Sequence, residues 1–189
     1  DGKRTATAGW YNTVAFEKAA LAQGLYAKSF NGDAFSDEMR QKVCEAIKKD
    51  LGQVDGVIYS LASPRRTDPK TGQTYKSVLK PKGAAYTNKS IDFEANKVTS
   101  VTLDTAVDQE VQDTIKVMGG EDWQLWIEAL TNQKLLAPNA VTVAYSYIGP
   151  DVTTPVYRNG TIGAAKDHLE ATAFTITDKL TALNGKAYV

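Results

Sequence analysis

Apolar positions in the first third of the chain alternate between a helical period and short strand-like runs. Residues 11–23 carry apolar side chains at helical spacing, which predicts a short helix. Ser36 is a good N-cap residue, and apolar positions recur after it until Gly52, so a second helix is predicted between them. The runs 25–30 and 54–60 predict two strands, the second rich in β-branched residues, as in strands buried on both faces.

The rest of the chain predicts an interruption followed by a return to the same alternation. Turn residues and two strand-like runs, 75–79 and 98–103, predict a β-rich insertion over the mouth of the sheet at about 64–104. The later elements predicted are helices at 105–118 and 122–131, a buried strand at 141–147, a loop at 148–160, a long helix at 162–183, and the approach to a further strand at 186–189. Short links between alternating helices and strands favour an α/β fold. We expect one domain over residues 1–189, a parallel sheet with helices on both faces.

Composition narrows the class of protein without identifying it. Lys plus Arg and Asp plus Glu each total 22, so the domain as a whole has no net attraction for nucleic acid or an anionic membrane. Cys44 is the single cysteine, which excludes an intrachain disulfide and favours a reducing compartment. No apolar run approaches the roughly 20 residues of a membrane span. The sequence opens without Met or an apolar leader, so we expect a cytoplasmic protein in processed or truncated form.

The stretch from the 141–147 strand into the following helix contains the strongest candidates for catalytic residues. A loop tyrosine, Tyr157, is separated by eight residues from a helix lysine, Lys166, and Gly160 and Gly163 allow a close turn between them. In open α/β sheets, ligands bind beyond the carboxyl ends of the strands, where this loop must lie. A phenol can donate to a developing oxyanion, and a nearby ammonium lowers its pKa. On spacing alone, however, such a pair more commonly has no catalytic role and consists of an ordinary loop tyrosine and a solvated helix lysine.

Several segments in order along the chain resemble one family. The stretches are TAGWYN at 7–12, FNGDAFSDE at 30–38, VIYSLASP at 57–64, LKP at 79–81, VMGGEDWQLWI at 117–127 and the Tyr157 to Lys166 segment. Together they resemble the FabV-type trans-2-enoyl-ACP/CoA reductases, large relatives of the short-chain dehydrogenases. The resemblance implies a Rossmann-like fold and NADH-dependent reduction of trans-2-enoyl-ACP or -CoA to the acyl thioester, in bacterial type II fatty acid synthesis.

The same resemblance implies roles for individual residues. Tyr157 corresponds to the proton donor and Lys166 to the lysine that binds the cofactor, while Tyr147 corresponds to a tyrosine that contacts the substrate. The pair Asp33 and Ala34 matches residues beside the adenine of NADH. Leu61 and Ala62 match the backbone that passes the ribose on the nicotinamide side. No metal is implied.

The chain also departs from the family pattern. The Gly-rich turn for the pyrophosphate and the acidic residue that selects NADH are not found in it, nor are the later substrate-pocket helices. We therefore expect a fragment truncated at both ends, inactive on its own, whose NADH preference is implied by the family alone. Loss of neighbouring strands also predicts that the fragment self-associates or rearranges.

Two rival functions remain open at this point. A keto-reducing short-chain dehydrogenase also uses Tyr and Lys, but there three residues normally separate the pair on one helix face. The other alternative is that the chain is an inactive fragment and not an enzyme. Six further residues are interpreted as structural or unresolved. His168 is interpreted as a surface residue and Cys44 as core. Trp123 and Trp126 are interpreted as packing anchors against the insertion, and Arg65 and Arg66 as a solvated turn or a phosphate contact.

Overall fold

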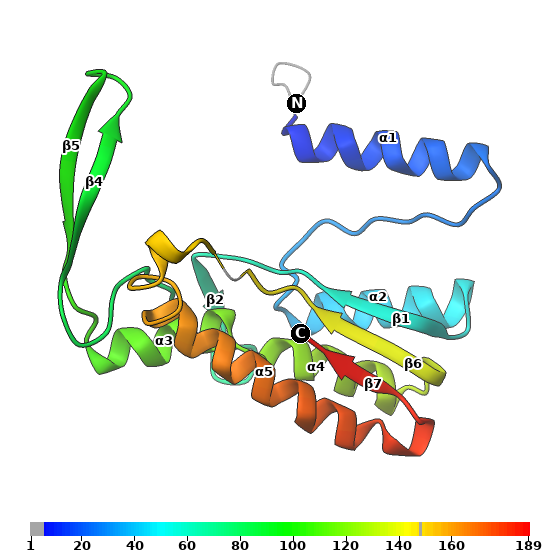
Figure 1. Cartoon of the computed structure of the whole chain (residues 1–189). Coiled ribbons are helices and arrows are strands. Elements are labelled where there is room, and N and C mark those ends of the chain that lie inside the picture. Colours follow the sequence, from blue (N-terminus) through cyan, green and yellow to red (C-terminus); the bar gives the residue numbers. More distant parts are fainter. Residues whose placement is uncertain (1–5, 148) are drawn as a thin grey trace. The chain divides into compact units, whose positions relative to one another are not determined.

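The computed structural model describes residues 6–147 and 149–189 and divides the chain into two compact units, Asp1–Asp33 and Ala34–Val189 (Figure 1). In the first unit, α1 spans Ala8–Ala22 and confirms the helix expected at 11–23, with an earlier start. Its N-terminus is capped by Thr7, whose Oγ1 accepts a hydrogen bond from the Trp10 N–H at 3.3 Å. Gly24, with φ of +72°, ends the helix in the left-handed conformation that glycine tolerates.

The strand expected at 25–30 does not form. In the described part of the first unit, residues 6–33, α1 is the one regular element. A β-strand exists through a ladder of backbone hydrogen bonds to a neighbouring strand, and no strand in this unit supplies that ladder. The alternating pattern of the segment is real, but the prediction of a strand there was wrong.

A parallel sheet organises the second unit. Its strands are β1 (Val54–Tyr59), β6 (Leu136–Ala144) and β7 (Lys186–Tyr188), in the order β1-β6-β7. Both pairings are parallel, with Ile58 opposite Val143 and Val143 opposite Tyr188. This confirms the predicted α/β class. The strand expected at 141–147 begins and ends earlier, and the C-terminal residues form a strand of the sheet instead of only approaching one.

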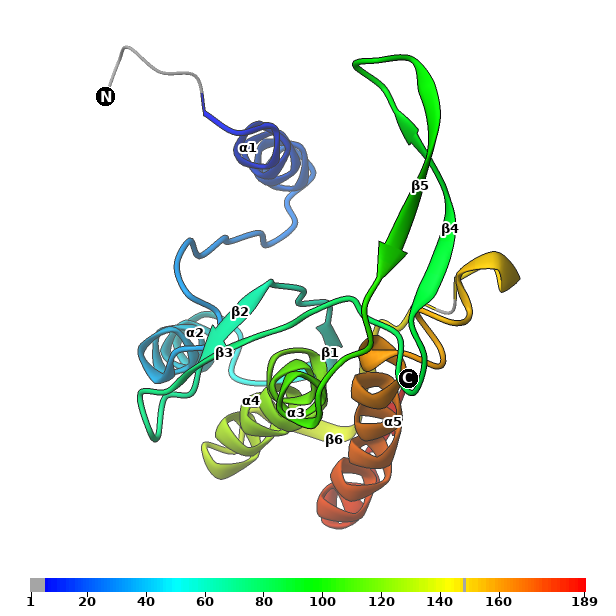
Figure 2. The same cartoon turned by 90° about the vertical axis from the view of Figure 1, so that its left-hand side faces the viewer.

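Helices α2 (Asp37–Asp50), α4 (Glu121–Asn132) and α5 (Thr161–Lys179) contribute to one core. Figure 2 shows α4 and α5 on the same side of the sheet. Trp123 of α4 is buried there, and its Nε1 donates to Thr142 Oγ1 of β6 at 2.8 Å. Trp123 thus packs on the sheet, and the expectation that it anchors the insertion was wrong.

The two faces of the sheet differ in burial. Cys44, the single cysteine, is fully buried in the core on the covered face, as expected, and burial raises the pKa of its thiol. On the opposite face the side chains of Ile58, Val141 and Tyr188 are exposed. Within the described residues of 34–189, helices therefore cover one face of the sheet, and the second covered face that we expected is not seen in this unit.

The insertion at 64–104 contains four strands in two antiparallel hairpins, where the sequence predicted two strands. The first pairs β2 (Arg65–Thr67) with β3 (Thr74–Lys76), and the second pairs β4 (Tyr86–Asp92) with β5 (Lys97–Leu103). The second hairpin projects from the rest of its unit (Figures 1 and 2). Helix α3 (Asp108–Met118) follows and packs on α5. Two 3-10 helices, Asp151–Thr153 and Thr181–Leu183, complete the unit.

Arg66 is the clearest error of the sequence interpretation. Its side chain is 1% exposed, so it lies neither in a solvated turn nor on a phosphate-binding surface. Its Nη1 donates to Glu121 Oε2 at 3.0 Å and to the backbone carbonyl of Lys116 at 2.7 Å. A buried guanidinium needs such partners, and here it joins β2 to the junction between α3 and α4.

A buried carboxylate joins three elements under the carboxyl end of β1. Asp122, 1% exposed at the start of α4, accepts from Arg40 Nη1 of α2 at 2.8 Å and from the Tyr59 hydroxyl of β1 at 3.1 Å. Burial raises the pKa of Asp122, an effect that Arg40 opposes. Burial and the neighbouring carboxylate also raise the pKa of Tyr59. The Asp122 carboxylate is stable in its charged form only while Arg40 and Tyr59 donate to it.

The first testable prediction concerns this carboxylate. Asp122→Ala should lower the free energy of unfolding by about 3–5 kcal/mol, because it removes the one buried carboxylate that pairs with the Arg40 guanidinium and leaves only the exposed Asp37 as its counter-ion. The matched control is Glu128→Ala on the same helix, which removes a half-buried pair with Lys179 and should cost about 0–1 kcal/mol. Urea unfolding of the protein that carries this chain measures both values. Equal losses in the two variants would show that the buried network contributes no more than a surface pair.

Candidate active site

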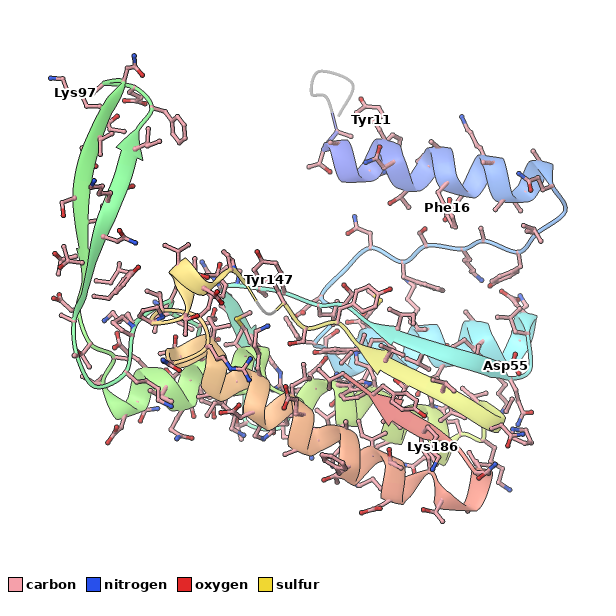
Figure 3. The ribbon with its side chains drawn as sticks, viewed as in Figure 1. Tyr11, Phe16, Asp55, Lys97, Tyr147 and Lys186 are labelled. Atoms are coloured by element: carbon pink, nitrogen blue, oxygen red, sulfur yellow. The ribbon has the colours of Figure 1, made fainter. Side chains whose placement is uncertain are left out.

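A cavity of about 390 Å³ lies where β1 and β6 reach their carboxyl ends. Four segments that are far apart in the sequence contribute to its walls. Five of the predicted site residues line it, namely Leu61, Ala62, Tyr147, Tyr157 and Lys166. The structure therefore brings together most of the residues that sequence comparison singled out, at the edge of the sheet where ligands of open α/β folds bind. Figure 3 shows Tyr147 in the segment that continues from β6.

The turn into α5 explains how Tyr157 and Lys166 meet at one cavity. A Cβ on Gly163 would lie 1.9 Å from the Arg158 carbonyl oxygen, and one on Gly160 would lie 2.0 Å from the Val156 carbonyl oxygen. The N–H groups of Gly160 and Gly163 both donate to the Tyr157 carbonyl oxygen, at 3.2 and 2.8 Å. Glycine is thus required by close backbone approach, as the sequence indicated, and the backbone of Tyr157 is held at the N-terminus of the helix that carries Lys166.

The N-terminus of α5 is also fixed from the side of the insertion. The Thr161 N–H donates to the Lys80 carbonyl oxygen at 3.0 Å, and the buried Thr161 hydroxyl donates to the Val78 carbonyl oxygen. Pro81 and Gly160 form an isolated antiparallel bridge. The segment before the projecting hairpin therefore clamps the turn that positions Tyr157.

The two tyrosines of the site are in direct contact. The ring centroids of Tyr147 and Tyr157 are 6.0 Å apart, with an interplanar angle of 70°, an edge-to-face arrangement. Tyr147 is exposed, so its ring forms an outer wall of the cavity and not part of the core. This contact restricts the orientation of the Tyr157 phenol.

Lys166 has a partner that the sequence did not indicate. Its Nζ donates to Ser146 Oγ at 3.0 Å and lies 5.9 Å from the centroid of the Tyr147 ring. Partial burial lowers the pKa of Lys166, while nearby Glu170 acts in the opposite direction. The ammonium is therefore held at the cavity wall next to Tyr147. Its expected influence on the pKa of Tyr157 stays a prediction.

The predicted adenine pair, Asp33 and Ala34, falls at the boundary between the two units. Asp33 belongs to the first unit, and its expected role stays a prediction. Ala34 lines a different cavity of about 390 Å³ along β1, and its carbonyl oxygen accepts from Trp126 Nε1 at 3.1 Å. The structure thus gives Ala34 a contact with α4 and leaves its expected contact with a nucleotide untested.

Sequence reasoning missed several walls of the cavity. Ser146 stands between two tyrosines just after a strand, a position that marks it as a ligand-facing residue in retrospect. Leu79 and Met118 come from the insertion and from the end of α3, and nothing in their local pattern indicated a site. His168 is exposed, as expected, yet its Nδ1 accepts a hydrogen bond from the Gly120 N–H at 3.0 Å and so caps the start of α4.

Among the described residues, no helix is both long and apolar enough to cross a membrane. The same residues hold no group of three or more His, Cys, Asp or Glu side chains that would bind a metal ion.

Comparison with known proteins places the chain among enzymes of one kind. Residues 4–189 match the sequence profile of the family described as the trans-2-enoyl-CoA reductase catalytic region. The chain is 61% identical over 186 residues to the enoyl-[acyl-carrier-protein] reductase [NADH] of Flavobacterium johnsoniae, and 58% identical over 186 residues to the trans-2-enoyl-CoA reductase [NADH] of Ruminiclostridium cellulolyticum. In both cases the match covers 98% of this chain and 47% of the relative, so the chain spans about half the length of these relatives.

Solved structures agree with the sequence comparison. The trans-2-enoyl-CoA reductase of Clostridium acetobutulicum in complex with NADH superimposes with a TM-score of 0.94 at 44% identity, over 100% of this chain and 48% of that one. The Treponema denticola trans-2-enoyl-CoA reductase in complex with NAD gives 0.90 at 48% identity, over 96% and 45%. The expected Rossmann-like fold is thereby confirmed. The cavity formed by Tyr147, Tyr157 and Lys166 lies within the matched residues, and the chain belongs to the trans-2-enoyl-CoA reductase catalytic region family.

Proposed function

We propose that the protein that carries this chain uses NADH to reduce trans-2-enoyl thioesters of acyl carrier protein or CoA in bacterial type II fatty acid synthesis. The observation that carries this proposal is the single cavity that gathers Tyr147, Tyr157 and Lys166 at the carboxyl ends of β1 and β6. The names of the similar proteins support it, since they include both an ACP-dependent and a CoA-dependent enoyl reductase. The shared substrate feature is an α,β-unsaturated thioester.

The residues of the cavity fit the nicotinamide end of NADH. Leu61 and Ala62 follow β1 directly, so their backbone lines the place where ligands meet a parallel sheet. Lys166 offers donors to ribose hydroxyls from the opposite wall. The other walls are mostly aromatic and aliphatic, which suits a planar ring in a water-poor site. NADH, when bound, would supply the hydride that adds to Cβ of the substrate.

Tyr157 is proposed as the acid of the reaction. Addition at Cβ drives negative charge onto the thioester oxygen, and the phenol of Tyr157 can donate a hydrogen bond to that oxygen. The proton required at Cα can then come from the same phenol. The edge-to-face contact with Tyr147 and the fixed turn at Gly160 keep the phenol in one place, which a positioned acid requires.

Lys166 is proposed to position the ribose and to favour the ionised form of Tyr157. The hydrogen bond to Ser146 holds its ammonium at the cavity wall, and its lowered pKa reflects a partly desolvated site. Tyr157 stands on a loop and Lys166 on α5, so the pair does not share one helix face as in the keto-reducing alternative. This difference favours enoyl reduction.

The remaining expectations also stand as proposals. The protein is proposed to be cytoplasmic, in keeping with an unpaired Cys44 and with relatives that act on ACP and CoA thioesters. Its proposed partners are these thioesters and NADH. We do not propose nucleic acid as a partner, and self-association of the fragment stays a prediction.

The second prediction tests the acid. Tyr157→Phe should lower kcat by about 10²–10⁴-fold while NADH binds as in the wild type, because the substitution removes only the transferable proton. Steady-state kinetics with crotonyl-CoA and fluorescence titration with NADH measure the two effects. Tyr188→Phe, outside the cavity, is the matched control and should leave both unchanged. A Tyr157→Phe enzyme that keeps more than about a tenth of kcat would exclude Tyr157 as the proton donor.

The third prediction separates Lys166 from Tyr157. Lys166→Ala should weaken NADH binding by about tenfold and also lower kcat, because the lysine serves both the ribose and the phenol. Lys179→Ala, near the end of the same helix, should change neither value. If Lys166→Ala lowers kcat without changing the Kd for NADH, the lysine does not bind the cofactor.

A further inference from the structure

A second cavity, of about 400 Å³, continues from the candidate active site toward the projecting hairpin. Leu79 and Tyr157 line both cavities, so the two meet at the proposed acid. The second cavity lies between the base of the β4–β5 hairpin and the loop that carries Val152 and Val156. The Tyr86 hydroxyl of β4 donates to the Val152 carbonyl oxygen at 2.9 Å and joins these two walls. Both views show this loop beside the hairpin base (Figures 1 and 2).

The cavity extends along the hairpin and is lined by both apolar and polar groups. Its apolar wall near the loop includes Leu79 and the buried Val156. Along β4 it reaches Asn88 and Ser90, which offer an amide and a hydroxyl. Four residues of strand, from Tyr86 to Ser90, correspond to about 13 Å, so the cavity leads well away from Tyr157. An occupant would therefore be long, narrow and partly polar.

We propose that this second cavity binds the phosphopantetheine arm of the substrate thioester, the part common to acyl carrier protein and CoA. The inference deepens the proposed function and rests on it. The arm carries two amides on an aliphatic chain, and an amide that leaves water requires a hydrogen-bond partner. The Ser90 hydroxyl can supply one. Asn88 Nδ2 donates to the Tyr86 hydroxyl at 2.6 Å and has a second N–H, and Thr153 Oγ1 donates to the Pro150 carbonyl oxygen at 2.8 Å and can still accept. An acyl chain would gain nothing from these groups, since it is bound by apolar contact alone.

The first cavity is the more apolar of the two and suits the acyl group better. Beyond the place proposed for the nicotinamide at Leu61 and Ala62, the first cavity is lined by Met118, Ile162 and Leu169 in addition to the site tyrosines. With the reacting carbons beside Tyr157, the acyl end stays in the first cavity and the carrier end leaves through the second. This division explains why relatives named for ACP and for CoA share one catalytic region: the site would recognise the arm that both carriers have.

The fourth prediction uses two substitutions on opposite faces of the same hairpin. Ser90 lines the second cavity and shares its face of the hairpin with Asn88 and Val101, which also line it. Ser100 does not line the cavity and lies on the other face, opposite Lys89, the one residue of that face that contributes to the lining. Successive side chains of a strand point to opposite faces, so Ser90→Trp fills the cavity and Ser100→Trp does not. Tryptophan is favourable in strands, so the hairpin should fold in both variants.

The substrates distinguish the arm from the acyl chain. Crotonyl thioesters of CoA, pantetheine and N-acetylcysteamine share one acyl group but differ in the length of the arm. Ser90→Trp should raise KM by about tenfold for the CoA and pantetheine thioesters, and by less than about twofold for the short N-acetylcysteamine thioester. Lengthening the acyl group on CoA should not change the factor. Ser100→Trp should behave as the wild type throughout.

Other outcomes would overturn the proposal. A KM increase that grows with acyl length would place the acyl chain in the second cavity. An equal effect on all three carriers, or an equal effect of Ser100→Trp, would show that the cavity does not recognise the arm. Calorimetric titration with CoA itself gives a readout without turnover, and Ser90→Trp should weaken that binding. Wild-type protein that reduces none of the thioesters would refute the proposed function, and the CoA titration would still decide whether the second cavity binds the arm.

Discussion

The interaction on which the rest of the second unit depends is the hydrogen-bonded group around Asp122. One buried carboxylate at the start of α4 accepts from Arg40 of α2 and from Tyr59 at the end of β1. A charge out of water is tolerated only when its donors are correctly placed, so the group penalises any shift of α2, α4 or β1 relative to the others. Leu61 and Ala62 follow Tyr59 by two and three residues, and their position at the cavity is set by this anchored strand end.

A second constraint acts on the other side of the cavity. The Tyr157 loop is tied to α5 through backbone bonds that leave no room for a Cβ at Gly160 or Gly163, and it is tied to the insertion through Thr161 and Tyr86. The insertion thus supports the catalytic loop at two points. The β-rich insertion therefore belongs to the structure of the site, although it interrupts the α/β alternation.

The sequence predicted the elements whose pattern reflects local burial. The Ser36 cap, the strand that begins at Val54 and the glycines before α5 all follow from short-range rules. It failed where a partner far along the chain decides the structure. Residues 25–30 have a strand pattern without a strand beside them. Strand β4 was missed because its sequence is mostly polar between Tyr86 and Ile91, whereas its equally exposed partner β5 carries Val98, Val101 and Leu103 and was predicted.

The site shows the same division. Tyr157 and Lys166 became credible through resemblance to a family, since their spacing alone indicates little. Leu79 and Met118 line the cavity because of how the chain folds back on itself, and no local signal marks them. Arg66 was misread because a basic residue in a turn-like segment normally faces water, whereas here Glu121 and the end of α3 draw it inside.

The burial of Cys44 has a practical consequence for measuring motion in this protein. The thiol is the only one in the chain, lies on α2 in the core that α2 shares with α4, and has a raised pKa. A thiol reagent can reach it only when the helices separate and water ionises the sulfur, so the rate of alkylation reports how often this core opens. The folded chain offers no competing thiol, and a cysteine introduced on the hairpin would accept a spectroscopic label selectively.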